Sequence, residues 1–291
     1  MPEVESQVQT TTGSGSTATS RLSNLGLRIV SGALMAAVTL AALYAGFPFW
    51  PLLVLVIAMG LGWEWNRMLA RSGTVTALGL LAALGLAIGL TAFGQPAIAV
   101  VVAVVGAVVL GVIGSGEGRL THAAGLLYFG LPSIALLWLR ADEPGGALGL
   151  VLVMIVVWVT DSAAYFTGRA VGGPKLWPAV SPNKTWSGSL GGAIGGVVAG
   201  VAFAAILGAQ PLAWIAVLSF ALSVACQAGD LMESALKRRF DRKDSSGLIP
   251  GHGGLMDRLD GLLMSVLVAA LVALWVDPRH PAAAVLPGLS P

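Results

Sequence analysis

The chain has 291 residues, of which 56% are hydrophobic and only 10% are charged, and its formal net charge is +2. About a quarter of the residues in soluble domains are charged, so this composition excludes a soluble globular protein. Its single cysteine, Cys226, lies in an apolar run and excludes disulfide bonds within the chain.

Several apolar runs approach the roughly 20 residues that a helix needs to cross about 30 Å of hydrocarbon. The alternation of a barrel strand is absent, and lipid-exposed backbone must satisfy its own hydrogen bonds, so we expect helices throughout. The predicted fold class is all-α, a polytopic integral membrane helical bundle of about nine transmembrane helices. The expected spans are residues 28–46, 49–63, 73–94, 96–113, 121–139, 147–166, 188–208, 211–229 and 259–276.

We divide the chain into four parts. Residues 1–25 are predicted to be a disordered cytoplasmic tail, because most of them are small, polar and rich in Ser and Thr. Residues 26–146 are predicted to form an N-terminal transmembrane scaffold. Residues 147–278 should form a second transmembrane region, with two cytoplasmic loops that carry the chemistry, and residues 279–291 a short C-terminal tail.

The distribution of basic residues predicts the orientation. If there are nine spans and the N-terminus is cytoplasmic, every Lys and Arg except Arg140 and Arg279 falls on the cytoplasmic side. This is the asymmetry expected of a membrane protein. We therefore expect a multi-pass protein of the cell membrane (plasma or inner membrane) with its polar loops in the cytoplasm.

Two further patterns concern packing. In the first half, Trp50, Trp63 and Trp65 are predicted to be interfacial anchors. In the span 188–208, glycines recur every four residues, which clears one helix face for a close neighbour. These glycines are Gly188, Gly192, Gly196 and Gly200.

The charged residues concentrate between Gly229 and Gly261. This stretch holds six carboxylates and six of the sixteen basic residues: Asp230, Glu233, Asp241, Asp244, Asp257 and Asp260, with Lys237, Arg238, Arg239, Arg242, Lys243 and Arg258. In its first part, the spacing i, i+3, i+4 and i+7 of one helical face is shared by Asp230, Glu233, Ser234 and Lys237. A Gly-rich loop with Pro250 should follow. Asp257 and Asp260 then share nearly one face at the start of the last span.

Carboxylates that come from two helices with a Gly-rich turn between them suit a hard divalent cation. Basic side chains among them suit a polyphosphate, so the stretch predicts a combined phosphate and metal site. For Arg239 and Arg242 the better interpretation is a solvated positive-inside signal near lipid head groups. For Asp230, Asp257 and Asp260 a functional role is favoured, because carboxylates at membrane depth are costly.

Two residues and one short run outside this core set of carboxylates have more than one possible role. His252 fits a general acid or base, a phosphate donor or a polar loop residue. Asp161, near the end of an apolar run, requires a metal or a basic partner. The run from Ser181 to Thr185 offers a turn, Lys184 and hydroxyls and suits a phosphate holder, although taken alone it is better explained as a polar interhelical loop.

The spacing of these residues resembles a known family signature. The pattern is Ser234-x-x-Lys237-Arg238, then Lys243-Asp244, then Pro250-x-His252-Gly253-Gly254-x-x-Asp257-Arg258-x-Asp260. It resembles the signature of the phosphatidate cytidylyltransferases, or CDP-diacylglycerol synthases. The runs DSAAYFTGR and SPNKTW are similar to that family's second region. The resemblance covers about residues 160–261, and Ser187 stands where the family usually has an acidic residue.

The resemblance implies an enzyme of phospholipid biosynthesis, a nucleotidyltransferase that converts CTP and phosphatidic acid to CDP-diacylglycerol and pyrophosphate. It implies metal ligands at Asp230, Asp257 and Asp260, with Mg²⁺ as the expected ion and a second, monovalent cation left open. The implied catalytic residues are Asp257, Asp260, Asp230, Lys237, Lys243 and His252. The implied substrate-binding residues are Lys184, Ser181, Ser234, Arg238, Asp244, Gly253, Gly254, Arg258 and Asp161.

The expected mechanism is in-line attack by a phosphatidate oxygen on the α-phosphorus of CTP. That oxygen is already anionic near neutral pH, so catalysis should depend on positioning and charge neutralisation. Expected partners are CTP, phosphatidic acid and membrane lipids, with no nucleic acid. The resemblance and the glycine-lined face also suggest a homodimer.

Three alternatives belong to other classes. One is an enzyme that uses CTP on another lipid phosphate, or a polyprenol kinase. Another is an ion-coupled transporter in which Asp161 and Asp257 line an ion path. The absence of evident inverted halves, and polar residues gathered on one side, argue against it. The third, a lipid-binding structural protein, is disfavoured by the density of carboxylates.

Overall fold

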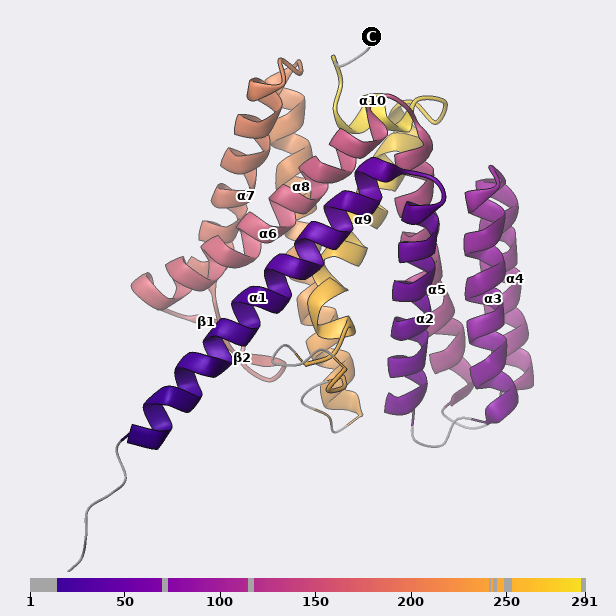
Figure 1. The fold of residues 1–291 in the computed structure, drawn as a ribbon, viewed down its shortest axis with the longest axis horizontal. Helices are drawn as coiled ribbons and strands as arrows, with labels where there is room; N and C mark the ends of the chain where they lie inside the picture. The colour runs from indigo at the N-terminus through magenta and orange to yellow at the C-terminus, as the bar shows by residue number, and fades with distance from the viewer. Residues whose placement is uncertain are drawn as a thin grey trace, which may run out of the picture.

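The computed structural model describes residues 15–69, 73–114, 118–240, 242, 245–248 and 253–288. Within these ranges the chain is almost entirely helical (Figure 1). The long helices are α1 (Gly15–Ala45), α2 (Phe49–Met68), α3 (Thr74–Ala92), α4 (Pro96–Ile113), α5 (Gly118–Ala141), α6 (Gly146–Val171), α7 (Trp186–Ile206), α8 (Leu212–Arg239) and α9 (Met256–Val276). A short helix, α10 (Pro281–Val285), and two antiparallel strands, β1 (Lys175–Trp177) and β2 (Ser181–Thr185), complete the described fold.

The helix lengths confirm the predicted fold class. Among the described residues, eight helices, α2 to α9, are long and apolar enough to cross a membrane. Helix α1 adds a shorter apolar stretch, Ile29–Ala45, where the first span was predicted. Glycines with positive φ follow several of these helices, among them Gly46 (φ 67°) and Gly94 (φ 78°). Glycine adopts this conformation without the steric cost of a Cβ, which explains why the helices end there.

Two groups of helices form one bundle. In Figure 1, α2 to α5 lie side by side, α6 to α9 form the other group, and α1 crosses in front of the second group at an angle. The predicted division at residue 146 falls at the start of α6. The core nevertheless crosses this division, since Trp50 and Val54 of α2 belong to the same buried cluster as Ile215 of α8 and Val266 of α9.

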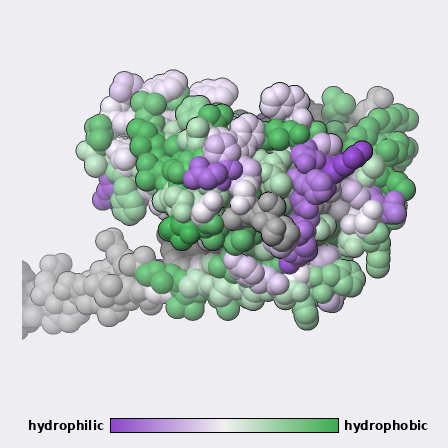
Figure 2. Space-filling view, turned by 90° about the horizontal axis from the view of Figure 1, so that it is seen from above, coloured by the Kyte–Doolittle hydropathy of each residue, from purple (hydrophilic) through white to green (hydrophobic). Residues whose placement is uncertain are grey.

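The bundle has two different ends. The strands and the start of α9 lie at one end, which we call the strand end, and α10 lies at the other, the α10 end (Figure 1). Helix α1 starts at the strand end and α9 ends at the α10 end, which agrees with an odd number of spans. Seen from the α10 end, hydrophilic residues are confined to a few places among hydrophobic ones (Figure 2). The assignment of the strand end to the cytoplasm stays a prediction.

Both termini differ from the sequence-based expectation. Helix α1 begins at Gly15, inside the predicted tail, because an apolar run fixes where a helix crosses the membrane and not where helical backbone begins. Residues 1–14 lie outside the described residues. The predicted C-terminal tail includes α10, which is packed against the bundle. The Trp214 indole donates a hydrogen bond to the Ala284 carbonyl at 2.9 Å, and the Ala282 N–H donates to Asp142 at 2.6 Å.

The prediction of three tryptophan anchors was wrong for two of them. Trp50 and Trp65 are only 3% and 2% exposed. Their indole N–H groups donate to the carbonyls of Leu136 (3.3 Å) and Thr121 (3.0 Å). A buried indole needs such a partner, and α5 provides both. Of the three, Trp63 alone is exposed, with the Arg67 guanidinium 4.8 Å from its ring.

The glycine-lined face of α7 packs closely, as predicted. A Cβ added at Gly192 would lie 2.9 Å from the Thr160 carbonyl oxygen of α6, and one at Gly200 would lie 2.1 Å from the Ser219 hydroxyl of α8. The face is therefore occupied by helices of the same chain. The homodimer stays a prediction, and it would need a different surface.

Candidate functional site

The site begins where α8 and α9 approach each other at the strand end. A Cβ added at Gly229 would lie 2.5 Å from the carbonyl oxygen of Asp260, and one at Gly261 would lie 2.7 Å from the Cys226 sulfur. Only glycine allows this approach. Asp230 follows Gly229 and Asp260 precedes Gly261, so the close contact brings two carboxylates together from opposite helices.

Three carboxylates meet at this contact. Asp230, Glu233 and Asp260, which we call the acidic cluster, each offer an oxygen within 4.8 Å of the others. Glu233 is 0% exposed, and Lys237 pairs with its Oε2, but no described residue donates a hydrogen bond to its Oε1. A buried carboxylate oxygen without a donor is costly, and carboxylate oxygens are the ligands that hard divalent cations prefer. The acidic cluster therefore fits a divalent metal ion.

Glu233 is a residue that sequence reasoning did not select. Its signal was present, because it stands three residues after Asp230 on the same polar face of α8. Sequence spacing could not separate it from a solvated residue. The structure buries it and places it between Asp230 and Lys237, whose Nζ lies 2.6 Å from Glu233 Oε2.

Two lysines neutralise part of this charge. Lys184 pairs with Asp230 Oδ2 from outside α8 and α9, because β2 carries it to the cluster. The Ser234 hydroxyl lies 3.4 Å from the other oxygen of Asp230. Lys237 of α8 pairs with Glu233 and also with Asp257 Oδ1, each at 2.6 Å.

The SPNKT run is a strand in the structure, whereas its sequence suggested a turn. In the β1–β2 pair, Lys175 lies opposite Thr185 and Trp177 opposite Ser181. Thr185 also accepts a hydrogen bond from the Gly188 N–H at 3.1 Å and so caps α7. Lys184 is thereby held between the strand pairing and the helix start. Ser181 lies at the other end of β2, and none of its described contacts reaches the acidic cluster.

Asp257 stands beside the acidic cluster with both of its oxygens engaged. Oδ1 accepts from Lys237, and Oδ2 accepts from the N–H of Ser245 (3.2 Å), the hydroxyl of Ser245 (3.1 Å) and the N–H of Gly254 (3.0 Å). This arrangement suits a residue that orients Lys237. The assignment of Asp257 as a metal ligand stays a prediction.

The remaining predicted residues surround this centre. Asp161 of α6 accepts a hydrogen bond from the Cys226 thiol at 3.4 Å and interacts electrostatically with Asp230, Lys184 and Arg258. Arg258 is exposed in the first turn of α9. Arg238 is exposed in the last turn of α8, and none of its described contacts reaches the acidic cluster.

The predicted Gly-rich loop before the last span is described in part. Lys243, Asp244 and His252 lie outside the described residues. Gly253 has a φ of 87°, and a Cβ added at Gly254 would lie 1.7 Å from the Ser245 hydroxyl, so both positions require glycine.

Ser187, the departure from the family pattern, has a structural role at the start of α7. Its hydroxyl donates to the Gly172 carbonyl and lies 3.0 Å from the Thr185 hydroxyl. The position therefore links the end of α6 to the start of α7 without adding a carboxylate to the site.

A second residue that sequence reasoning missed is Glu64 of α2. It is 0% exposed and accepts hydrogen bonds from residues at the start of α9. Its signal was a lone carboxylate within an apolar span, which is expected to have a function. We had assigned the first half of the chain to the scaffold alone, and the contact between α2 and α9 appears only in the fold.

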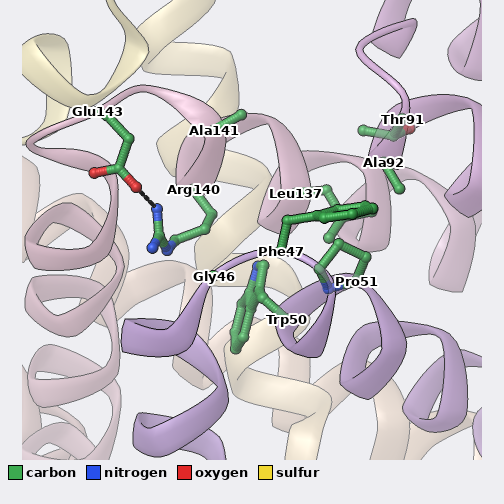
Figure 3. Close-up of a pocket in the computed structure, with 10 residues that line it drawn as sticks. All are labelled: Gly46, Phe47, Trp50, Pro51, Thr91, Ala92, Leu137, Arg140, Ala141 and Glu143. Carbon is green, nitrogen blue, oxygen red and sulfur yellow. Dashed lines mark hydrogen bonds and ion pairs between the residues drawn. The ribbon is translucent and has the colours of Figure 1, made fainter.

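A separate cavity lies at the α10 end, with a volume of about 240 Å³. Figure 3 shows Phe47 and Trp50 on its lining, with Arg140 paired to Glu143. Arg140 Nε also donates to the Leu43 carbonyl at 2.7 Å. None of the predicted site residues lines this cavity, and its arginine is satisfied by neighbours within the chain.

Comparison with known proteins identifies the family of this chain. Residues 26–276 match the family model described as the cytidylyltransferase family. The phosphatidate cytidylyltransferase of Brucella suis is 40% identical over 268 residues, which cover 90% of this chain and 98% of the relative. That of Bacillus subtilis is 39% identical over 147 residues, 50% of this chain and 54% of the relative. That of Haemophilus influenzae is 42% identical over 130 residues, 43% of this chain and 45% of the relative. The chain belongs to the cytidylyltransferase family.

Proposed function

We propose that this membrane protein transfers the cytidylyl group of CTP to phosphatidic acid, giving CDP-diacylglycerol and pyrophosphate. The observation that carries the proposal is the acidic cluster paired with Lys184 and Lys237 at one end of an apolar bundle. A water-soluble triphosphate and a lipid phosphate can meet there, while the acyl chains stay in the bilayer. The names of the relatives point to the same reaction. Because CTP is a cytosolic nucleotide, we place the strand end on the cytoplasmic side of the cell membrane.

Asp230, Glu233 and Asp260 would hold a divalent cation, which we propose to be Mg²⁺. Bound there, Mg²⁺ would supply positive charge to the phosphate oxygens of CTP. Lys184 and Lys237 would bind further phosphate oxygens, since each is a cation that lies beside the acidic cluster. Asp257 would keep Lys237 in place through its 2.6 Å contact.

The chemical step needs little proton transfer. A phosphatidate oxygen forms a bond to the α-phosphorus of CTP, and the bond from that phosphorus to the β-phosphate oxygen breaks, so pyrophosphate leaves with the electron pair. The attacking oxygen is anionic near neutral pH and requires no strong base. The chain therefore contributes orientation and charge neutralisation, through its lysines and the residues that fix them. Arg258, in the first turn of α9, is proposed to join them. The same role is proposed for Lys243, Asp244 and His252, which lie outside the described residues.

The test is product formation by the detergent-purified protein given CTP, phosphatidic acid and Mg²⁺, with pyrophosphate and CDP-diacylglycerol both measured. We expect both products only when all three are present, and none when ATP replaces CTP. Asp260→Asn should abolish turnover. Glu143→Gln, the same kind of change at the α10 end, should not.

Two outcomes would change the assignment. Faster turnover with another lipid phosphate would favour the alternative enzyme that activates that lipid. No product from folded protein with any lipid phosphate would refute the reaction. An ion-coupled transporter gains no support from the site, because the carboxylates gather at one end of the bundle and not at its midplane.

A further inference from the structure

Glu64 is a buried carboxylate near the end of α2, in the scaffold half of the chain. It is 0% exposed, and no ion pair among the described residues involves it. A carboxylate buried in this way is strongly destabilising unless several donors satisfy it. The groups that donate hydrogen bonds to Glu64 therefore indicate its role.

Four hydrogen bonds reach Glu64, two on each oxygen. Oε1 accepts from the N–H of Leu255 at 2.7 Å and from the hydroxyl of Ser246. Oε2 accepts from the N–H of Met256 at 2.8 Å and from the hydroxyl of Ser245 at 3.2 Å. All four donors belong to the segment that leads into α9.

This carboxylate caps α9 from another helix. Leu255 is the N-cap residue of α9, and its own side chain makes no capping hydrogen bond. The first N–H groups of a helix have no partner within the helix, and a negative charge there is stabilising. Glu64 supplies both the acceptor and the charge. One turn earlier in α2, Gly60 leaves room for the Leu255 side chain, which would lie 2.9 Å from a Cβ at that position.

Ser245 connects Glu64 to the proposed active site. Its hydroxyl lies within hydrogen-bond distance of Glu64 and of Asp257 Oδ2, and its N–H donates to the same Asp257 oxygen. The other oxygen of Asp257 holds Lys237. A continuous set of contacts therefore runs from α2, through Ser245 and Asp257, to the lysine that we assign to the triphosphate.

We propose that Glu64 is a positioning residue, which fixes residues 245–246 and the start of α9 against α2 so that Asp257 holds Lys237 in its productive place. The kinetic part of this proposal rests on the proposed function. Because none of the described contacts of Glu64 reaches the acidic cluster, Lys184 or Lys237, it would act only through these partners.

The substitution Glu64→Gln tests this with almost no change of shape. Each oxygen of Glu64 accepts one backbone N–H, and a backbone donor cannot become an acceptor. The amide nitrogen would therefore face a donor whichever way the side chain turned. Supporting residues of this kind typically change activity by about 10- to 100-fold. We expect kcat/KM for CTP to fall by about this factor, with an increase in KM as well as a decrease in kcat.

The change in KM separates positioning from a loss of folded protein. A smaller active fraction lowers the apparent kcat but leaves KM for CTP unchanged. Hydrogen exchange provides a second measurement that does not depend on turnover, and peptides covering residues 245–258 should exchange faster in Glu64→Gln. Glu143→Gln should match the wild type in both measurements.

If Glu64→Gln does not fold, Ser246→Ala removes one of the four hydrogen bonds and should give the same changes at a smaller size. Wild-type kinetics in the folded variant would overturn the proposal, even if exchange were faster. If the wild type itself made no CDP-diacylglycerol, the proposed function would fail. Exchange would still test the placement of α9 by Glu64, and an unchanged pattern would overturn it.

Discussion

The contact between α8 and α9 predicts a large effect from one added methyl group. In Gly229→Ala, the new Cβ would meet the carbonyl oxygen of Asp260 at 2.5 Å and the Met264 side chain at 2.9 Å. The methionine can move, but the carbonyl belongs to the backbone of α9. Relief requires α8 and α9 to separate until the contact reaches about 3.4 Å, a movement of roughly 0.9 Å.

This movement should affect activity more than stability. Overpacking of this size costs about 1–3 kcal/mol of folding free energy. The same shift also separates Asp230 from Asp260, which flank the contact, and a misplacement of about 1 Å can reduce a catalytic rate by about 100-fold. We therefore expect Gly229→Ala to fold, to need more Mg²⁺ for half-maximal rate, and to lose about two orders of magnitude in kcat/KM.

The assay measures CDP-diacylglycerol formation by purified protein over a range of Mg²⁺ concentrations, together with the thermal unfolding midpoint. Gly89→Ala in α3 is the matched control, because nothing lies within 4 Å of its added Cβ. That control should keep full activity and gain up to about 1 kcal/mol of helix stability. Wild-type rate and Mg²⁺ dependence in Gly229→Ala would refute the idea that this contact sets the acidic cluster.

Three further predictions concern the same site. Gly261→Ala should also reduce activity, but adding Cys226→Ala should partly restore it, because the atom nearest to the new Cβ is the Cys226 sulfur and not a backbone atom. Equal rates in Gly261→Ala and in the double variant would contradict this. Glu233→Gln should raise the Mg²⁺ concentration for half-maximal rate by about 10-fold or more, since it removes one ligand charge, whereas Asp257→Asn should reduce turnover with a smaller change in Mg²⁺ dependence. An equal or larger change in Asp257→Asn would restore Asp257 as a metal ligand. Lys184→Gln should raise KM for CTP by about 10-fold, and an unchanged KM would remove Lys184 from the phosphate site.

The fold class and the location of the candidate site could be predicted from the sequence on physical grounds. Long apolar runs specify membrane-spanning helices because a bilayer leaves the backbone few alternatives. The four-residue spacing of Gly188, Gly192, Gly196 and Gly200 specified a closely packed helix face, since helical periodicity places such residues on one side. The acidic residues of the stretch from Gly229 to Gly261 indicated the candidate site, because carboxylates at membrane depth are costly and usually have a function.

Periodicity could not show which side chains meet across different helices. Trp50 and Trp65 fit the composition of an interfacial belt, yet α5 buries both and accepts their N–H groups. Sequence spacing also could not show that β2 carries Lys184 to Asp230.

The sequence by itself determined the class of fold, the packed face of α7 and the stretch in which the candidate site lies, because each depends on residues that are near one another in the chain. Tertiary structure alone decided that Glu233 joins Asp230 and Asp260, and that Glu64 holds the start of α9. Glu64 and Met256 are 192 positions apart in the chain. Their contact depends on how whole helices pack, which no local pattern of residues encodes.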